Sequence, residues 1–452
     1  MRELTSYSAT SLAKLMRERE VSPVEIAEAY LARIERLNPK LNAIVTLSPK
    51  LIEDAKAAEA KLIHGELLGP LHGVPFTVKD TIDTGGLRTT SGSAMRENYI
   101  PDHDAPAVVR MKGAGAILLG KTNTAELAME YSADNPVFGR TLNPHDHTRT
   151  PGGSSGGEAA AIATCMSAAG LGSDLAGSIR IPAHFCGIAG FKPATASVPG
   201  AGQFPPSAGP YSLGSVIGPL ARRVEDLRMI FHVLAGNDLT LGSKDLRGLR
   251  VSWYTDDGVS PVTNETRKAV EAAAKVLANS GLAVEEVRPP GVEQGFDMWM
   301  KLFSRATVVL LRNVYAGNEE KAGAFVKWRL ATADDAAPPS LDEYIQSWLE
   351  RDRLRTQLIA WMNGGLLLAP VGAVPALKHD ALKADVDGKQ ISAWRAFSYS
   401  QTFNAFDLPA ATVPVGRSPE GLPIGVQIVG VPGKEENIFG AAELIEKELV
   451  VA

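Results

Sequence analysis

The chain has 452 residues, of which 45% are hydrophobic and 21% charged, and its net charge is −5. This composition is typical of a globular protein, and the small net charge argues against a nucleic-acid-binding surface. The two cysteines, Cys165 and Cys186, lie outside any CxxC motif, and no HExxH motif occurs, so we expect no metal and a reducing compartment. The longest apolar run, 364–377, contains Pro370 and Pro375 and is too short to span a bilayer. We therefore expect a cytoplasmic protein that does not insert stably into membranes.

The N-terminal region, 1–65, is predicted to be helical. Ser22, Pro23 and Glu25 supply an N-cap, a proline at the first helical position and a glutamate at the third. Apolar residues then recur at helical spacing, at Ile26, Tyr30, Ile34 and Leu37. A second helix is expected over 51–63.

Strand and helix patterns alternate through 66–290 and again through 363–452. Strands are predicted at 73–78, 116–119, 249–254, 283–287, 366–370, 412–415 and 422–429. Helices are predicted at 105–112, 158–169, 264–278 and 435–449. This alternation is typical of an α/β fold in which helices cover a central sheet.

Residues 291–362 interrupt the alternation. They have a helical pattern that includes the aromatic residues Trp299, Phe303, Tyr315, Trp328 and Trp348. Such an insert either shapes a substrate pocket or completes the core, and the sequence does not decide between the two.

Two segments match known functional motifs, but the residues around them do not fit the structures that these motifs require. Residues 115–122 match the phosphate-loop pattern GxxxxGK[ST], but the positions between the glycines are apolar and predict a buried strand. Residues 152–156 match GxSxG, but the preceding segment holds Pro144 and Pro151 and is a poor strand for a nucleophile elbow. A Ser-His-Asp hydrolase would also need a downstream histidine, but His184, His232 and His379 have no catalytic neighbours and are interpreted as structural.

A serine–lysine constellation remains. Ser178 and Ser154 each lie in a turn of small residues, and Lys79 follows an apolar strand. Together in a dry pocket, these groups make a nucleophile and its base. Backbone N–H groups of 175–178 can then hold an oxyanion. Considered singly, the three residues are better explained as a buried turn serine, a helix N-cap and a lysine at a strand end.

Four stretches carry a resemblance to a known family: GPLHGVPFTVKD (69–80), GRTLNPHDHTRTPGGSSGGEAAA (139–161), GSDLAGSIRIPAHFCGIAGFKP (172–193) and TFNAFDLPAATVPVG…GLPIGVQIVG (402–430). They resemble the amidase signature family. The resemblance covers nearly the whole chain except the helical insert. It implies a single α/β/α domain, residues 1–452, around a mixed, twisted central sheet.

The resemblance also implies the site. Lys79, Ser154 and Ser178 map onto a Ser–cisSer–Lys triad with a cis peptide bond before Ser154. The oxyanion hole is expected from Leu175, Ala176, Gly177 and Ser178. Supporting roles are expected for Ser155, which would help hold the Lys79 ammonium, and for Asp174 and Arg180, which would fix the nucleophile turn. Substrate contacts are expected at Met129, Glu130, Tyr131 and Gly153.

Three positions depart from the family pattern. Leu175 and Ala176 replace the more usual Thr-Gly, Glu130 stands where a small residue is frequent, and Glu158 follows SSGG. Glu158 and the motif GQFP at 202–205 are similar to the branch that contains fatty-acid amide hydrolases.

The expected function is a stand-alone serine hydrolase of small-molecule amides, with carbamates (urethanes), aryl anilides or esters as further substrates. No cofactor is expected, and the chain is expected to be a monomer or a homodimer. One alternative is the amidase subunit of a glutamine-dependent amidotransferase. A second is a non-catalytic binding module that retains the fold.

Overall fold

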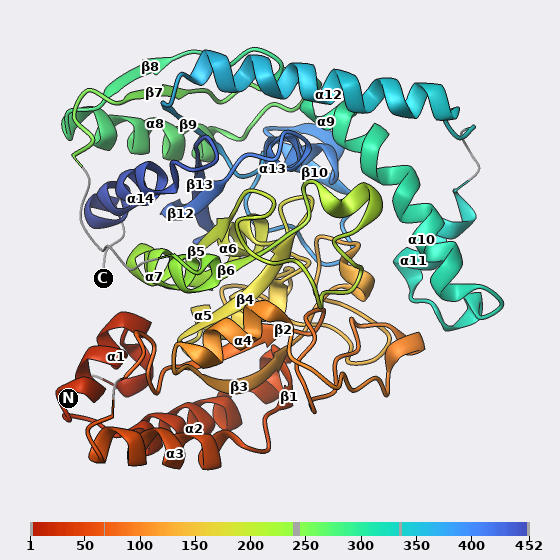
Figure 1. Cartoon of the computed structure of the whole chain (residues 1–452). Helices are drawn as coiled ribbons and strands as arrows, with labels where there is room; N and C mark the ends of the chain where they lie inside the picture. The colour runs from red at the N-terminus through yellow and green to blue at the C-terminus, as the bar shows by residue number, and fades with distance from the viewer. Residues whose placement is uncertain (1–2, 67, 238–244, 334–336, 450–452) are drawn as a thin grey trace.

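The computed structural model describes residues 3–66, 68–237, 245–333 and 337–449. In this part of the chain, one mixed sheet of 11 strands runs through the molecule (Figure 1). Across the sheet, the strands follow the order β1 (Ile44–Leu47), β3 (Ile117–Thr122), β2 (Pro75–Lys79), β4 (Ala169–Asp174), β6 (Val216–Ala221), β5 (Ala189–Lys192), β12 (Ala410–Arg417), β13 (Pro423–Val429), β9 (Leu366–Pro370), β7 (Arg250–Trp253) and β8 (Ala283–Glu286).

The sheet is parallel in two places and antiparallel elsewhere. Strand β2 pairs in parallel with β3 and β4, and β7 pairs in parallel with β8 and β9. The inner strands, such as β2, β4 and β6, are buried at every residue, as expected where helices cover both faces. The predicted α/β/α fold around a mixed sheet is confirmed.

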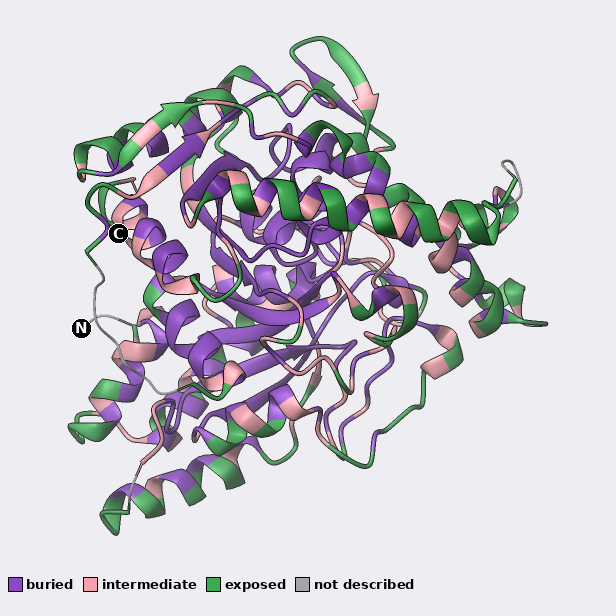
Figure 2. Cartoon of the chain, turned by 45° about the horizontal axis from the view of Figure 1, so that its top comes forward, coloured by how far each residue is buried: buried purple, intermediate pink, exposed green. Residues whose placement is uncertain are grey.

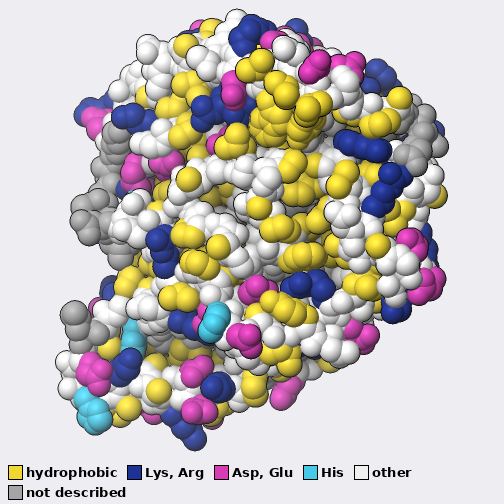
Figure 3. Space-filling view, turned by 45° about the vertical axis from the view of Figure 1, so that its right-hand side comes forward, with side chains coloured by type: hydrophobic (Ala, Val, Ile, Leu, Met, Phe, Trp, Pro, Cys, Tyr) yellow, Lys and Arg dark blue, Asp and Glu magenta, His cyan; other side chains and the backbone are white. Residues whose placement is uncertain are grey.

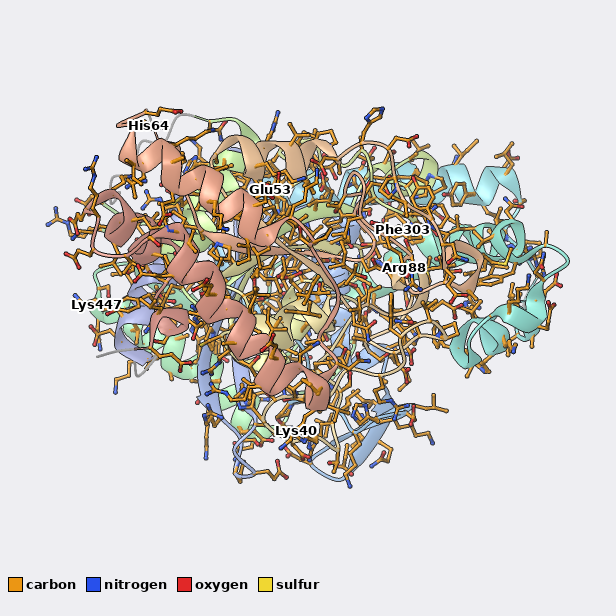
Figure 4. All side chains as sticks on the ribbon, turned by 90° about the horizontal axis from the view of Figure 1, so that it is seen from below. Lys40, Glu53, His64, Arg88, Phe303 and Lys447 are labelled. Carbon is orange, nitrogen blue, oxygen red and sulfur yellow. The ribbon has the colours of Figure 1, made fainter. Side chains whose placement is uncertain are left out.

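Three helices precede β2: α1 (Ala9–Arg17), α2 (Pro23–Leu41) and α3 (Leu51–Ile63). The capping box predicted at the start of α2 is present, because Ser22 and Glu25 each accept a hydrogen bond from the other's backbone N–H. Figure 4 looks onto α2 and α3, with Lys40 on α2 and Glu53 on α3 labelled.

The two faces of the sheet carry different helices. One layer is continuous and is made of α4 (Pro106–Gly113), α7 (Val224–Ala235), α14 (Glu435–Leu449) and α8 (Asn264–Asn279). The other face carries α5 (Gly156–Ala163), α6 (Arg180–Cys186) and α13 (Ser398–Ala405). The helices of this second group flank the turns that hold Ser154 and Ser178, so these turns lie between the sheet and its cover.

The described residues of 295–362, namely 295–333 and 337–362, form a helical segment beyond the second face. It contains α9 (Gly295–Trp299), a π-helical turn (Met300–Ser304), α10 (Arg305–Tyr315), α11 (Ala324–Ala331) and α12 (Leu341–Met362). Figure 2 shows that α12 is largely exposed, whereas the sheet beneath it is buried. A hairpin of β10 (Lys383–Val386) and β11 (Lys389–Ser392) lies in a separate small sheet. Short 3₁₀ turns complete the description: Leu4–Ser6, Ala94–Arg96, Glu126–Ala128, Gly209–Ser212, Val292–Gln294, Glu319–Lys321 and Arg395–Phe397.

One predicted helix is wrong at its C-terminal end. The alanine-rich helix expected over 158–169 spans Gly156–Ala163, and Ala169 instead begins β4. The helix stops because Cys165 adopts a left-handed conformation (φ 59°) and the Met166 N–H donates back to the Ala161 carbonyl. Alanine tolerates both structures, so the composition of this stretch concealed the boundary.

The structure also bears on the expectations about the phosphate-loop pattern, the cysteines and membrane-spanning segments. Residues 117–122 form buried strand β3, which confirms that this segment is no phosphate loop. Cys165 and Cys186 are both free thiols. No helix in the described part of the chain is long and apolar enough to cross a membrane.

Candidate active site

Lys79 is the last residue of β2, and its side chain is fully buried. Its Nζ donates hydrogen bonds to Ser154 Oγ at 2.6 Å and to Ser173 Oγ at 2.9 Å. Burial lowers the pKa of Lys79 to about 7, against the opposing effect of the Asp174 and Glu158 carboxylates. Near neutral pH a substantial fraction of this amine is therefore uncharged and able to accept a proton.

Ser154 follows a cis peptide bond from Gly153, as the resemblance implies. Only glycine fits at 153, because a Cβ there would lie 1.9 Å from the Ser132 carbonyl oxygen. The next residue, Ser155, donates its backbone N–H to the Ser178 carbonyl at 3.2 Å. This bond ties the turn of Ser154 directly to the turn of Ser178.

Ser178 lies between β4 and α6 and is 6% exposed. Ser178 lines a large cavity, whereas Lys79 and Ser154 behind it have no exposed surface. Ser178 Oγ makes no hydrogen bond to any residue that the structure describes. The hydroxyl at the cavity is therefore free to meet a ligand, and the amine lies on its protected side.

The backbone N–H groups around Ser178 are not equivalent. Gly177 N–H donates to Asp174 Oδ1 at 2.8 Å, so this expected oxyanion donor is already engaged. The N–H groups of Leu175, Ala176 and Ser178 have no acceptor in the described part of the chain, and all three residues line the cavity. The expectation of four open donors is corrected to three, because the Asp174 carboxylate folds back onto its own turn.

Asp174 and Arg180 form a fully buried ion pair at 3.0 Å. Asp174 also accepts hydrogen bonds from the N–H groups of Gly177 and Ile179, and Arg180 donates to Asn404 and Gln427. Burial alone would raise the pKa of Asp174, but the Arg180 guanidinium outweighs it and holds this pKa well below its usual range. The contacts expected of the pair are present, and neither side chain has exposed surface.

The support expected from Ser155 for Lys79 is wrong. Ser155 Oγ lies at the backbone of Ser173, at 3.4 Å from both its N–H and its carbonyl, and the second partner of Lys79 is Ser173 Oγ. Ser173 was missed because its position depends on the pairing of β2 with β4, which no local pattern specifies. Glu158 lies in the same buried region, bonded to Thr77 and Thr122, and burial raises its pKa to about 7.

Three of the four expected substrate contacts, Glu130, Tyr131 and Gly153, are not among the residues that line the cavity. Met129 lines the cavity. The Glu130 carboxylate accepts from Ser132 Oγ, and burial raises its pKa. The Tyr131 hydroxyl donates to the Ala176 carbonyl and accepts from Gln401, both at 2.8 Å. Tyr131 therefore supports the turn from behind and does not line the cavity, while Gly153 is buried beneath Ser132.

The cavity has a volume of about 1110 Å³, beyond the range of about 300–1,000 Å³ typical of small-molecule sites. Its apolar lining comes mainly from the helical segment and includes Met298, Trp299, Val308, Phe325, Trp328 and Trp394. Charged side chains also line it, namely Lys301, Arg305, Arg329, Asp342, Glu343 and Glu350. Figure 3, which turns this side of the molecule forward, shows hydrophobic groups gathered between basic and acidic ones.

The histidines interpreted as structural have structural contacts. His184 is buried, with Nε2 at the Val374 carbonyl and Nδ1 accepting from Gly425 N–H. Burial lowers the pKa of His184 to about 4, so the ring is neutral. His232 contacts Glu436, and His379 contacts the His147 carbonyl. None of the three lines the cavity.

Known proteins are similar to this chain in sequence and in architecture. Residues 25–439 match the family model described as Amidase. The chain is 34% identical to a glutamyl-tRNA(Gln) amidotransferase subunit of Carboxydothermus hydrogenoformans over 98% of both chains. It is 32% identical to fatty-acid amide hydrolase 2 of Homo sapiens, covering 98% of this chain and 89% of that protein. A crystal structure of an amidase superposes with a TM-score of 0.88 and 28% identity, covering 98% of this chain and 100% of that one.

Proposed function

The chain belongs to the amidase signature family, enzymes that act on amides, and on that premise we propose that it is a stand-alone serine hydrolase of carboxylic amides. The observation that carries the proposal is the buried Lys79 amine, hydrogen-bonded to Ser154 behind a serine that faces a cavity. Lys79, Ser154 and Ser178 are the catalytic residues of this proposal.

Acylation follows from the order of these groups. Neutral Lys79 takes the proton of Ser154, and Ser154 takes the proton of Ser178, so that Ser178 Oγ attacks the amide carbonyl carbon. The carbonyl π electrons move to oxygen, where the free N–H groups of Leu175, Ala176 and Ser178 bind the oxyanion. When the tetrahedral intermediate collapses, the C–N bond breaks and the relay returns a proton to the leaving nitrogen.

Deacylation runs through the same groups. A water molecule gives a proton to the relay and attacks the Ser178 ester, which regenerates the serine and releases the carboxylic acid. Both half-reactions need an uncharged Lys79, which its lowered pKa provides near neutral pH. Carbamates, aryl anilides and esters present the same carbonyl group and fit the same chemistry.

The cavity favours substrates with a bulky apolar group. Its tryptophan, phenylalanine and methionine side chains offer apolar contact, which contributes roughly 25 cal/mol per Å² of buried apolar surface. We therefore propose amides whose acyl or amine portion is aryl or aliphatic, in line with the similarity to a fatty-acid amide hydrolase.

A second candidate function is that of an amidotransferase subunit, and one observation favours it: the 34% identity to such a protein over nearly the whole chain. In that role the same site would hydrolyse glutamine and pass ammonia to a partner. Glutamine carries a zwitterionic head group and has no bulky apolar group to contact the tryptophan-rich lining. The lining therefore supports the stand-alone hydrolase.

A substrate panel tests the proposal. Purified protein is assayed with aryl amides, long-chain amides, carbamates and glutamine, in wild type and Ser178→Ala. We expect turnover of apolar amides that the variant loses, and labelling of Ser178 by a fluorophosphonate. Turnover restricted to glutamine would favour the amidotransferase role. If the wild-type protein shows neither labelling nor turnover, the non-catalytic binding module is the function that remains.

A further inference from the structure

The turn that carries the oxyanion donors is held by its carbonyl groups. The Leu175 carbonyl accepts from Trp299 Nε1 at 2.8 Å, and the Ala176 carbonyl accepts from the Tyr131 hydroxyl at 2.8 Å. Neither donor is near the turn in sequence. Two consecutive peptide groups are therefore fixed from outside, by residues of two different regions.

The two peptide groups differ at their other ends. A trans peptide group is planar, with its C=O and N–H pointing in opposite directions, so holding the carbonyl also sets the direction of the N–H. The peptide group between Ala176 and Gly177 is held at both ends, because Gly177 N–H donates to Asp174. The peptide group between Leu175 and Ala176 is held only at its carbonyl, and its Ala176 N–H has no acceptor among the described residues.

Trp299 is well placed to direct this free N–H. Its side chain is 6% exposed and stacks on Trp394 at 5.5 Å between ring centroids. It ends α9, which approaches α13 closely because Gly295 has no Cβ; a Cβ there would lie 2.3 Å from Thr402 Oγ1. All six tryptophans lie in the described part of the chain, and Trp299 is the one whose indole N–H donates a hydrogen bond there.

We propose that Trp299 is a positioning residue that aims the Ala176 N–H at the substrate oxyanion. This inference rests on the proposed amide hydrolysis and adds a residue from the helical segment to its machinery. Since Trp299 also lines the cavity, one side chain forms part of the substrate wall and supports the oxyanion hole. The helical segment then affects kcat as well as substrate affinity.

The test removes the indole N–H and keeps an aromatic ring. In Trp299→Phe we expect kcat for an apolar amide to fall about 10- to 100-fold, because one oxyanion donor loses its alignment. KM is expected to stay within about threefold, since the ground-state carbonyl depends less on this donor. Affinity for a trifluoromethyl ketone, which forms a tetrahedral oxyanion adduct with Ser178, is expected to fall by the same factor as kcat/KM.

Trp348→Phe is the matched control. Trp348 belongs to the same helical segment and packs on Phe303, but it does not line the cavity and its indole N–H makes no hydrogen bond in the described structure. We expect kcat of this variant within about twofold of wild type. Replacing Trp299 by β-(3-benzothienyl)alanine, which has the same shape without the donor, separates the hydrogen bond from packing and is expected to reproduce the loss.

The positioning role of Trp299 and the proposed amide hydrolysis can fail separately. Turnover by wild type that Ser178→Ala abolishes establishes the hydrolase. In that active enzyme, unchanged kcat and ketone affinity in Trp299→Phe or in the benzothienyl variant would overturn the positioning role, as would a change confined to KM. Absence of amide turnover in wild type would overturn both proposals together.

Discussion

The floor and the wall of the cavity are built on different physical terms. The floor consists of β2, β4 and the turns of Ser154 and Ser178, where Lys79, Ser154, Asp174 and Arg180 have at most 1% exposure and are hydrogen-bonded. The wall is the described part of the helical segment 295–362, where some lining side chains are exposed, such as Trp328 at 51%, and others are buried, such as Trp299 at 6%. Burial perturbs pKa values and fixes geometry, so the floor sets the chemistry. Exposed apolar contacts adapt more readily, so the exposed side chains of the wall set substrate preference, while the buried Trp299 is the wall residue proposed to act on the chemistry.

The largest expected effect comes from the nucleophile. Ser178→Ala removes the covalent step, and we expect kcat to fall about 10⁴- to 10⁶-fold, as for other serine nucleophiles that act as part of a unit. The measurement is initial rate on an apolar amide, with circular dichroism as the control for folding. Residual turnover above about one-hundredth of the wild-type rate would contradict the assignment of Ser178 as the nucleophile.

The base comes next. Lys79→Met is expected to lower kcat about 10²- to 10⁴-fold, because it removes the proton acceptor and keeps an apolar side chain of similar length. In wild type, a pKa near 7 means that protonated Lys79 accumulates as the pH falls. We therefore expect kcat/KM to drop about tenfold per pH unit below about pH 7 and to level off above it. A pH-rate profile that is flat between about pH 5 and 8 would contradict this assignment.

The ion pair of the floor gives a stability effect. Asp174→Asn leaves the Arg180 guanidinium buried without its counter-ion, and we expect the free energy of unfolding to fall by about 3–5 kcal/mol. Urea titration measures it. As a matched change, Glu285→Gln breaks the exposed pair with Arg250 and is expected to cost about 0–1 kcal/mol. Equal losses in the two variants would show that burial does not distinguish them.

The smallest effect is expected at the wall. Trp328→Ala removes an apolar contact worth about 1–2 kcal/mol, so KM for a bulky apolar amide should rise about 5- to 30-fold while kcat changes little. Steady-state kinetics measure the split. Trp361→Phe, on the same segment but stacked on Arg250 outside the cavity lining, serves as the control. A change in kcat without one in KM would mean that this part of the wall acts on chemistry.

Much of the site could be predicted because its parts are short and local. The glycine-wrapped turns around Ser154 and Ser178 and the strand before Lys79 lie within continuous stretches, and backbone freedom and hydrophobic pattern act over a few residues. The predicted end of the helix that stops at Ala163 was wrong within such a stretch, because alanine permits both the helix and the strand that follows.

Sequence alone determined the α/β alternation, the burial of β3 and the identity of the serine and lysine candidates. Only the tertiary structure decided that Ser173 and not Ser155 contacts Lys79, that Gly177 N–H is engaged by Asp174, and that Trp299 and Tyr131 hold the turn of 175–176. The reason is physical: Trp299 lies 124 positions from Leu175 in the chain. A hydrogen bond across that distance depends on how strands pair and helices pack, which no local pattern encodes.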